Sequence, residues 1–95
     1  MGDKVTPKAP IRRVPIVVKD VIAEEVRITG DFTDWLKDGI RLSHNGKNEW
    51  RTVLPLGPGR YQYRLLVDGE WKDHADASER VENPFGSKNC VLKVV

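Results

Sequence analysis

The clearest structural signal in this sequence is the stretch RYQYRLLVDGEW, residues 60–71. Apolar and polar side chains alternate along residues 61–67, which is typical of a strand with one buried face. Asp68-Gly69 comes next, and these residue types tolerate the positive φ angles of a two-residue type I′ turn. The stretch therefore predicts a β-hairpin in which Leu66 pairs with Trp71.

This register decides which way Trp71 points. The odd-numbered residues of the strand, two tyrosines, a leucine and a valine, make the more apolar set, so we expect them in the core. Arg64 and Leu66 then face outward. Because paired residues share a face of the sheet, we expect Trp71 to point outward as well, close to Arg64.

An outward tryptophan beside an arginine has two interpretations. The ring can stack on a flat ligand with an apolar face and a hydroxylated rim, as a sugar has. Burying about 100 Å² of ring and sugar surface would contribute on the order of 2.5 kcal/mol before ordering costs. Alternatively, Trp71 covers Leu66 and the stem of Arg64, while Asp73 forms a weak surface ion pair with Arg64. The local sequence favours neither.

The rest of the chain has the same strand character and no strong helix signal. Residues 24–30 alternate with Val26 and Ile28 on one face, and Pro15 suits an edge strand. Residues 73–87 are rich in Asp, Ser, Asn, Pro and Gly, so we expect a loop there. Six or seven short strands predict one all-β domain, an immunoglobulin-like β-sandwich. Besides residues 60–67, the expected strands are residues 11–19, 24–30, 40–43, 49–56 and 89–95.

The charge balance argues against a nucleic-acid partner. Sixteen Lys and Arg residues against fourteen Asp and Glu leave a net charge of +2, and no basic cluster follows the expected strands. No stretch approaches roughly twenty apolar residues and the N-terminus lacks a signal-peptide core, so we expect a cytoplasmic protein without a membrane partner. We expect residues 1–10 to be a disordered arm before a module at residues 11–95.

The residues able to carry chemistry form no catalytic or metal pattern. Cys90 is the one cysteine, and its apolar strand suits a core residue better than a reactive thiol. His44 has no serine or cysteine with an orienting acid beside it. Asp73, His74 and Asp76 belong to one flexible loop, which is more typical of solvated charge than of a metal site. The acidic residues cluster in turns and at strand edges, unlike a glycosidase carboxylate pair. We expect no catalysis, metal or cofactor.

A second tryptophan lies in the loop TGDFTDW, residues 29–35. Trp35 either serves a ligand there or caps the end of the sandwich, and the residues alone leave both possibilities open. The third tryptophan, Trp50, shares its alternation with Leu54 and Leu56. We therefore expect Trp50 in the core.

Three segments, in this order and spacing, resemble the family 48 carbohydrate-binding modules: TGDFTDW (29–35), EWRTVLPLGPGRYQYRLLVDGEW (49–71) and NPFGSKNCVLKV (83–94). The family includes the glycogen-binding domain of AMP-activated protein kinase β subunits and the early-set domains of isoamylases and branching enzymes. The resemblance covers about residues 13–95. It implies an early-set β-sandwich that binds α-1,4-linked glucan: glycogen, starch, maltooligosaccharide or cyclodextrin.

The resemblance also implies a binding site. In the glycogen-binding members two tryptophans stack on glucose rings, and a basic residue and an asparagine bond sugar hydroxyls. An aliphatic residue and a hydroxyl lie on a loop that embraces the glucan. The basic residue is often lysine, which is a point charge, whereas arginine offers a planar fork of donors. The matching positions here are Trp35, Arg64, Trp71, Phe85, Ser87 and Asn89.

The chain departs from the family after its second site tryptophan, where Asp-Pro is common and this sequence has His74-Ala75. The path of the loop is therefore open. The function we expect is a non-catalytic module that binds α-1,4-glucan, with a glycogen-metabolising enzyme or a kinase complex as its protein partner. The alternative is an early-set interaction domain that packs on a catalytic or regulatory partner without binding sugar. Both site tryptophans and Asn89 favour the first.

Overall fold

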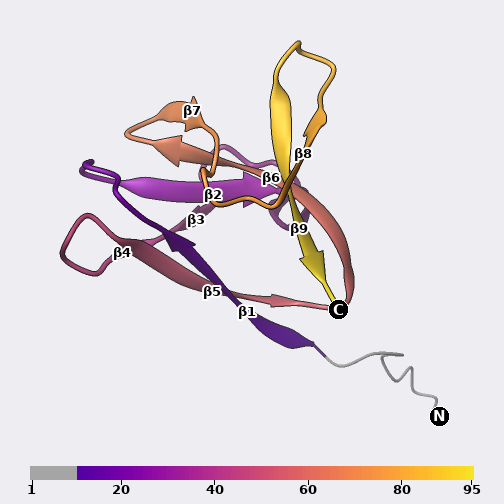
Figure 1. Ribbon diagram of the computed structural model, residues 1–95, viewed down its shortest axis with the longest axis horizontal. Helices are drawn as coiled ribbons and strands as arrows, with labels where there is room; N and C mark the ends of the chain where they lie inside the picture. Colours follow the sequence, from indigo (N-terminus) through magenta and orange to yellow (C-terminus); the bar gives the residue numbers. More distant parts are fainter. Residues whose placement is uncertain (1–10) are drawn as a thin grey trace.

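The structure, a computed structural model, describes residues 11–95, and the arm expected at residues 1–10 lies outside the described residues. Two antiparallel sheets enclose one core (Figure 1), which confirms the predicted all-β sandwich. One sheet has the strand order β1-β5-β4; the other has β3-β2-β6-β9-β8, with β7 paired to β6. The elements are β1 (Arg12–Val18), β2 (Val26–Gly30), the 3-10 helix η1 (Asp31–Thr33), β3 (Ile40–Arg41), β4 (Ser43–His44), β5 (Trp50–Leu56), β6 (Gly59–Val67), β7 (Glu70–Lys72), β8 (Glu79–Glu82) and β9 (Lys88–Val94).

The smaller sheet follows the predicted strand rules. β1 lies at its edge, and Pro15 pairs with Val53 of β5. A proline is tolerated at an edge because the missing N–H can face away from the neighbouring strand. Along β5 the alternation buries Trp50 and Leu54. Trp50 is 3% exposed, which confirms its assignment to the core.

The core lies between the inward faces of both sheets. Cys90 is fully buried within it, as predicted. Leu66 and Val91 are also buried, but they do not belong to the core cluster, because they lie on the outward faces of β6 and β9. The buried residues of the core cluster are Ile16, Val18, Val26, Ile28, Leu42, Trp50, Leu54, Leu56, Tyr63, Leu65, Cys90 and Val94.

Two predicted segments are wrong in detail. The expected strand at residues 40–43 is two short strands, β3 and β4, which belong to different sheets, and the buried Leu42 lies between them. The expected loop at residues 73–87 contains β8, which pairs antiparallel with β9. The described residues therefore form nine strands rather than six or seven. β8 was missed because its sequence, ERVE, is short and charged, and its pairing with β9 determines that it is a strand.

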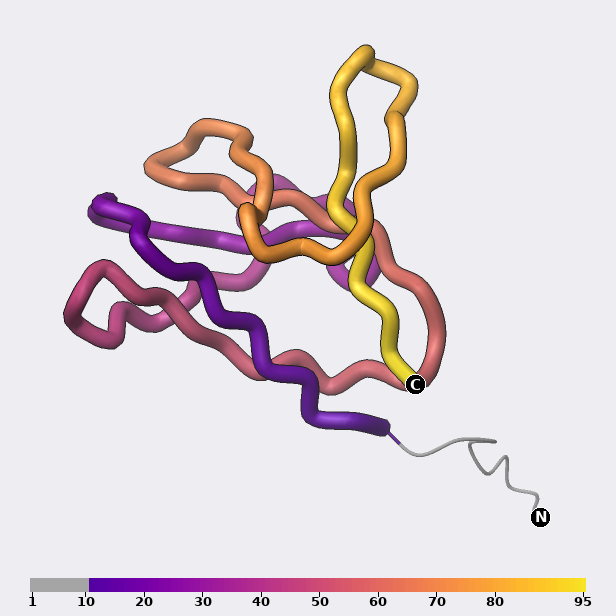
Figure 2. The backbone as a smooth tube through the Cα atoms, viewed as in Figure 1, coloured from indigo at the N-terminus to yellow at the C-terminus, as the bar shows by residue number. Residues whose placement is uncertain are grey.

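Along one of its edges, the strand β6 pairs with two different strands in turn. Gly59 to Tyr63 pair with β9, and Leu65 to Val67 pair with β7. Arg64 lies between these two stretches, where β7 and β9 diverge from each other. Figure 2 shows the β6–β7 hairpin and the β8–β9 hairpin as two separate projections, the first toward the left of the view and the second toward the top. The outward side chains beside this split are therefore flanked by two different hairpins.

Candidate functional site

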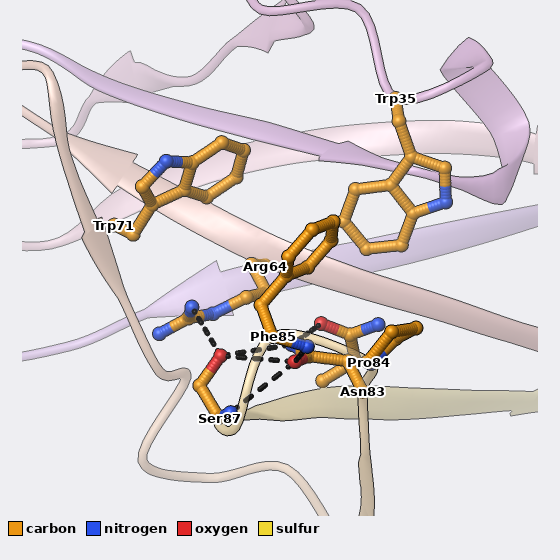
Figure 3. A pocket seen from close by; sticks show the side chains of 8 residues that line it. Trp35, Arg64, Trp71, Asn83, Pro84, Phe85 and Ser87 are labelled. Carbon is orange, nitrogen blue, oxygen red and sulfur yellow. Dashed lines mark hydrogen bonds between the residues drawn. The ribbon is translucent and has the colours of Figure 1, made fainter.

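A pocket of about 530 Å³ opens at this split in the sheet. Its walls come from the loop after β2, from β6 and β7, and from the β8–β9 hairpin, as Figure 3 shows. The structure brings together all six residues that the family resemblance implied. Asn83 and Pro84 also line the pocket and were not predicted. The lining residues are Trp35, Arg64, Trp71, Asn83, Pro84, Phe85, Ser87 and Asn89.

Trp71 is placed by the hairpin that the sequence predicted. Asp68 has φ 51° and Gly69 has φ 83°, as a type I′ turn requires. Leu66 pairs with Trp71, which confirms the register. The Trp71 side chain points outward and is 44% exposed, and the Arg64 guanidinium carbon lies 5.8 Å from its ring centroid. This orientation leaves a large apolar surface at the pocket.

Arg64 connects two walls of the pocket. Its Nη2 donates to Asp73 Oδ1 at 3.1 Å, which is the ion pair that the alternative interpretation of Trp71 included. Its Nη1 donates to Ser87 Oγ at 3.4 Å, on the opposite hairpin. The Nε atom is buried and has no hydrogen-bond partner among the described residues. Because each Nη group carries two hydrogens, Arg64 retains donors beyond these two contacts.

Trp35 lies in a strained loop after η1. Asp34 and Trp35 both have left-handed backbone conformations, with φ 55° and 57°, and the Trp35 N–H donates to the Gly30 carbonyl at 2.9 Å. The indole nitrogen of the half-buried side chain donates to Asp31 Oδ1 at 2.9 Å. The polar edge of the ring is therefore already bonded, and the ring faces are what Trp35 can offer a ligand.

Phe85 is at the tip of the β8–β9 hairpin and is 91% exposed. In Figure 3 its ring lies between Trp71 and Trp35, and all three rings line one pocket. Gly86 follows with φ 82°, a conformation that favours glycine in a tight turn. Three aromatic side chains from three separate segments thus surround the same space.

Asn89 and Asn83 form a polar network at the base of this hairpin. Asn89 is 8% exposed; its Oδ1 accepts from Asn83 Nδ2 and its Nδ2 donates to Gln62 Oε1, both at 3.0 Å. Asn83 was missed by sequence reasoning. The available signal was the dipeptide Asn83-Pro84, since an asparagine before a proline favours a turn.

His74 corrects the expectation of solvated charge in its loop. It is only 8% exposed, with Nδ1 2.7 Å from the Tyr63 hydroxyl and Nε2 2.9 Å from the Val17 carbonyl oxygen. Burial raises the pKa of Tyr63, so its hydroxyl stays protonated. The imidazole joins β6 of one sheet to β1 of the other, and this contact fixes the path of the chain where the sequence departs from Asp-Pro.

Residues 11–95, the part of the chain that the structure describes, contain no group of three or more His, Cys, Asp or Glu side chains that could hold a metal ion. None of their helices is long and apolar enough to cross a membrane.

Comparison with known proteins agrees with this geometry. Residues 16–95 match the family described as the glycogen recognition site of AMP-activated protein kinase. The chain is 31% identical over 85 residues to the chloroplastic phosphoglucan phosphatase LSF1 of Arabidopsis thaliana, covering 90% of this chain and 14% of that protein. It is 33% identical over 92 residues to the 5′-AMP-activated protein kinase subunit beta-1 of Bos taurus, covering 96% of this chain and 33% of that subunit. The chain thus spans about one third of the kinase subunit and a smaller part of the phosphatase.

Proposed function

This chain belongs to the family of the glycogen recognition site of AMP-activated protein kinase, and we propose that it binds α-1,4-linked glucan in the pocket between Trp35, Trp71 and Phe85. The single observation that supports this proposal best is the meeting of two exposed or half-exposed indoles with hydrogen-bond donors around one open pocket. Apolar ring faces suit the faces of glucose rings, and polar side chains suit their hydroxyl groups.

Stacking supplies most of the binding free energy in this proposal. Each indole that covers a glucose ring removes about 100 Å² from water, worth on the order of 2.5 kcal/mol before ordering costs. Two such contacts on an open surface predict a dissociation constant between about micromolar and millimolar. Glycogen, starch, maltooligosaccharides and cyclodextrins all present such rings.

The polar residues of the site have a narrower role in the proposal. Arg64 offers its remaining N–H groups to sugar hydroxyls, with Ser87 beside it. Asn89 is nearly buried and already bonded to Asn83 and Gln62, so it can reach a sugar only with its remaining N–H or lone pair. We therefore infer that Arg64 contributes more directly to sugar binding than Asn89.

We infer further that the module performs no catalysis and holds an attached or associated enzyme near the polymer. Relatives that are longer than this chain include a kinase subunit and a phosphoglucan phosphatase, so a kinase complex or a glucan-metabolising enzyme is the proposed partner. The cytoplasmic location stays a prediction from the sequence, and imaging a tagged full-length protein tests it.

Calorimetric titration with maltoheptaose and β-cyclodextrin tests the binding proposal, with cellohexaose as the control for the sugar linkage. We expect saturable binding of the α-linked ligands alone. Trp71→Ala and Trp35→Ala should each weaken it by roughly 10- to 50-fold, since each removes one stacking surface. Val53→Ala is the control variant, because Val53 is a half-exposed apolar side chain on the other sheet.

Absence of binding up to millimolar ligand would contradict the proposal and leave the interaction-domain alternative as the better account. Equal binding of cellohexaose would contradict the linkage preference.

A further inference from the structure

Phe85 lines the pocket, but other side chains do not pack around its ring. Its side chain is 91% exposed, so neighbouring apolar residues do little to hold the ring. An exposed aromatic ring that is to meet a ligand must be positioned by its backbone instead, because free movement would add an ordering cost to binding. The bonds that hold the tip of the β8–β9 hairpin are therefore the relevant feature.

Those bonds converge on Asn83. The Asn83 side-chain oxygen accepts the backbone N–H of Phe85 at 2.9 Å and that of Ser87 at 3.2 Å. Its backbone N–H donates to the Ser87 carbonyl at 2.9 Å, which closes the loop. Asn83 thus holds the peptide groups on both sides of the tip, and Phe85 lies between them.

The same side chain connects the tip to the floor of the pocket. Asn83 Nδ2 donates to Ser87 Oγ at 2.9 Å and to Asn89 Oδ1 at 3.0 Å. The Ser87 hydroxyl also donates to Asn83 Oδ1 at 3.2 Å. Both amide hydrogens and both lone pairs of Asn83 are therefore engaged within the protein. The amide has no remaining capacity for a sugar hydroxyl, so Asn83 is not itself suited to be a ligand for the glucan.

We propose that Asn83 is a positioning residue that holds Phe85 over the pocket, where the proposed glucan site already places the Phe85 ring. This inference rests on the proposed glucan binding. In this inference the β8–β9 hairpin raises glucan affinity through Phe85, and that gain in affinity requires the Asn83 side chain.

A double-mutant cycle tests the dependence, with maltoheptaose affinity measured by calorimetry. Asn83→Ala and Phe85→Ala should each weaken binding by about 5-fold, and the double variant should bind no more weakly than Phe85→Ala alone. Asn83→Asp keeps the acceptor for the Phe85 and Ser87 N–H groups and should bind more tightly than Asn83→Ala. If Asn83→Ala does not fold, Asn83→Leu replaces it in the cycle, because leucine has a similar size and no acceptor for these N–H groups.

Asn45→Ala is a closely matched control. Asn45 opens the loop between β4 and β5, its N–H donates to the carbonyl of Glu49 at 2.7 Å, and its side chain donates to the Glu49 carboxylate at 3.0 Å. Asn45 therefore bonds to a residue four positions later, as Asn83 does to Ser87, but it does not line the pocket. We expect its affinity for maltoheptaose to be unchanged.

Amide hydrogen exchange of the free protein supplies a readout without ligand. Asn83→Ala should accelerate exchange at Phe85 and Ser87, with the core strands unchanged. Unchanged exchange at both amides, or wild-type affinity of Asn83→Ala, would overturn the inference while leaving the proposed function intact. The inference would also be overturned if Asn83→Ala weakened maltoheptaose binding by as much in the Phe85→Ala variant as in the wild type. If the wild type binds no glucan, the proposed function fails, and the role of Asn83 in glucan affinity fails with it.

Discussion

The Trp35 indole nitrogen donates a hydrogen bond to one carboxylate oxygen of Asp31 at 2.9 Å. The other oxygen accepts the backbone N–H of Gln62 in β6 at 2.8 Å. Asp31 therefore fixes the edge of a pocket-lining indole to a strand that is 31 residues away in the sequence. A carboxylate is needed for this bridge because both of its oxygens act as acceptors.

Asp31→Asn should loosen Trp35 and weaken glucan binding. An amide can accept from only one of the two N–H groups and presents its own donor to the other. We expect affinity to fall by about 3-fold, together with a shift of the Trp35 indole N–H resonance in the free protein. Asp34→Asn removes a charge from the same loop and serves as the control. An indole resonance that does not move in Asp31→Asn would contradict the role of this bridge.

His74→Ala should destabilise the fold more than any change to its exposed loop neighbours. The Val17 carbonyl can only accept, so His74 Nε2 carries the proton, and the Tyr63 hydroxyl donates to Nδ1. Truncation leaves the buried Tyr63 hydroxyl and the partly buried Val17 carbonyl without this partner, and we expect the free energy of unfolding to fall by roughly 2–4 kcal/mol in urea titrations.

Asp76→Ala, in the same loop and exposed, should change the free energy of unfolding by less than about 0.5 kcal/mol. A similar small change in His74→Ala would show that the imidazole bridge between the sheets is dispensable.

The sequence predicted what local rules determine. Alternation and the Asp68-Gly69 turn were sufficient for the register of the hairpin, and that register placed Trp71 beside Arg64. The burial of Trp50 and Cys90 followed from the same two-residue period. These features depend on residues close in the sequence, where side-chain period and turn chemistry act directly.

What was missed depends on distant partners. β8 is a strand because β9 pairs with it, and His74 is buried because β1 and β6 offer partners for both ring nitrogens. The composition of the loop around His74 is typical of solvated loops, so composition alone indicated that His74 would be exposed. The positioning roles of Asp31 and Asn83 likewise require the loop geometry, since sequence patterns do not show which N–H groups a side-chain oxygen will meet.

Gly30→Ala should destabilise the protein next to the site. Gly30 pairs with Tyr63 across β2 and β6, and an added Cβ would overlap the Gln62 carbonyl oxygen and lie 2.8 Å from the Tyr63 Cα. Both obstacles are backbone atoms, so the two strands must separate. We expect the free energy of unfolding to fall by about 1–3 kcal/mol.

Gly46→Ala is the control that separates the cost of this steric overlap from the cost of replacing a glycine that has a positive φ. Gly46 has φ 70° with open space around its Cβ position, so its variant carries only the left-handed backbone cost of about 1 kcal/mol. Gly30→Ala should also lower glucan affinity, since Trp35 follows directly on the loop, whereas Gly46→Ala should not. Equal affinity of both variants would contradict the link between Gly30 and the pocket.

Arg64→Lys tests whether the site needs the arginine fork or only a positive charge. Arg64 reaches Asp73 and Ser87 from two different nitrogens, and a lysine ammonium is a single point that cannot reproduce this geometry. We expect maltoheptaose affinity to fall by about 5-fold, equivalent to roughly 1 kcal/mol, with little change in the urea unfolding midpoint. Arg60→Lys is the matched control, because Arg60 lies on the same strand and its guanidinium binds Glu79 away from the pocket. Full affinity in Arg64→Lys would mean that one ammonium group is sufficient and that the connection between the two hairpins contributes nothing to binding.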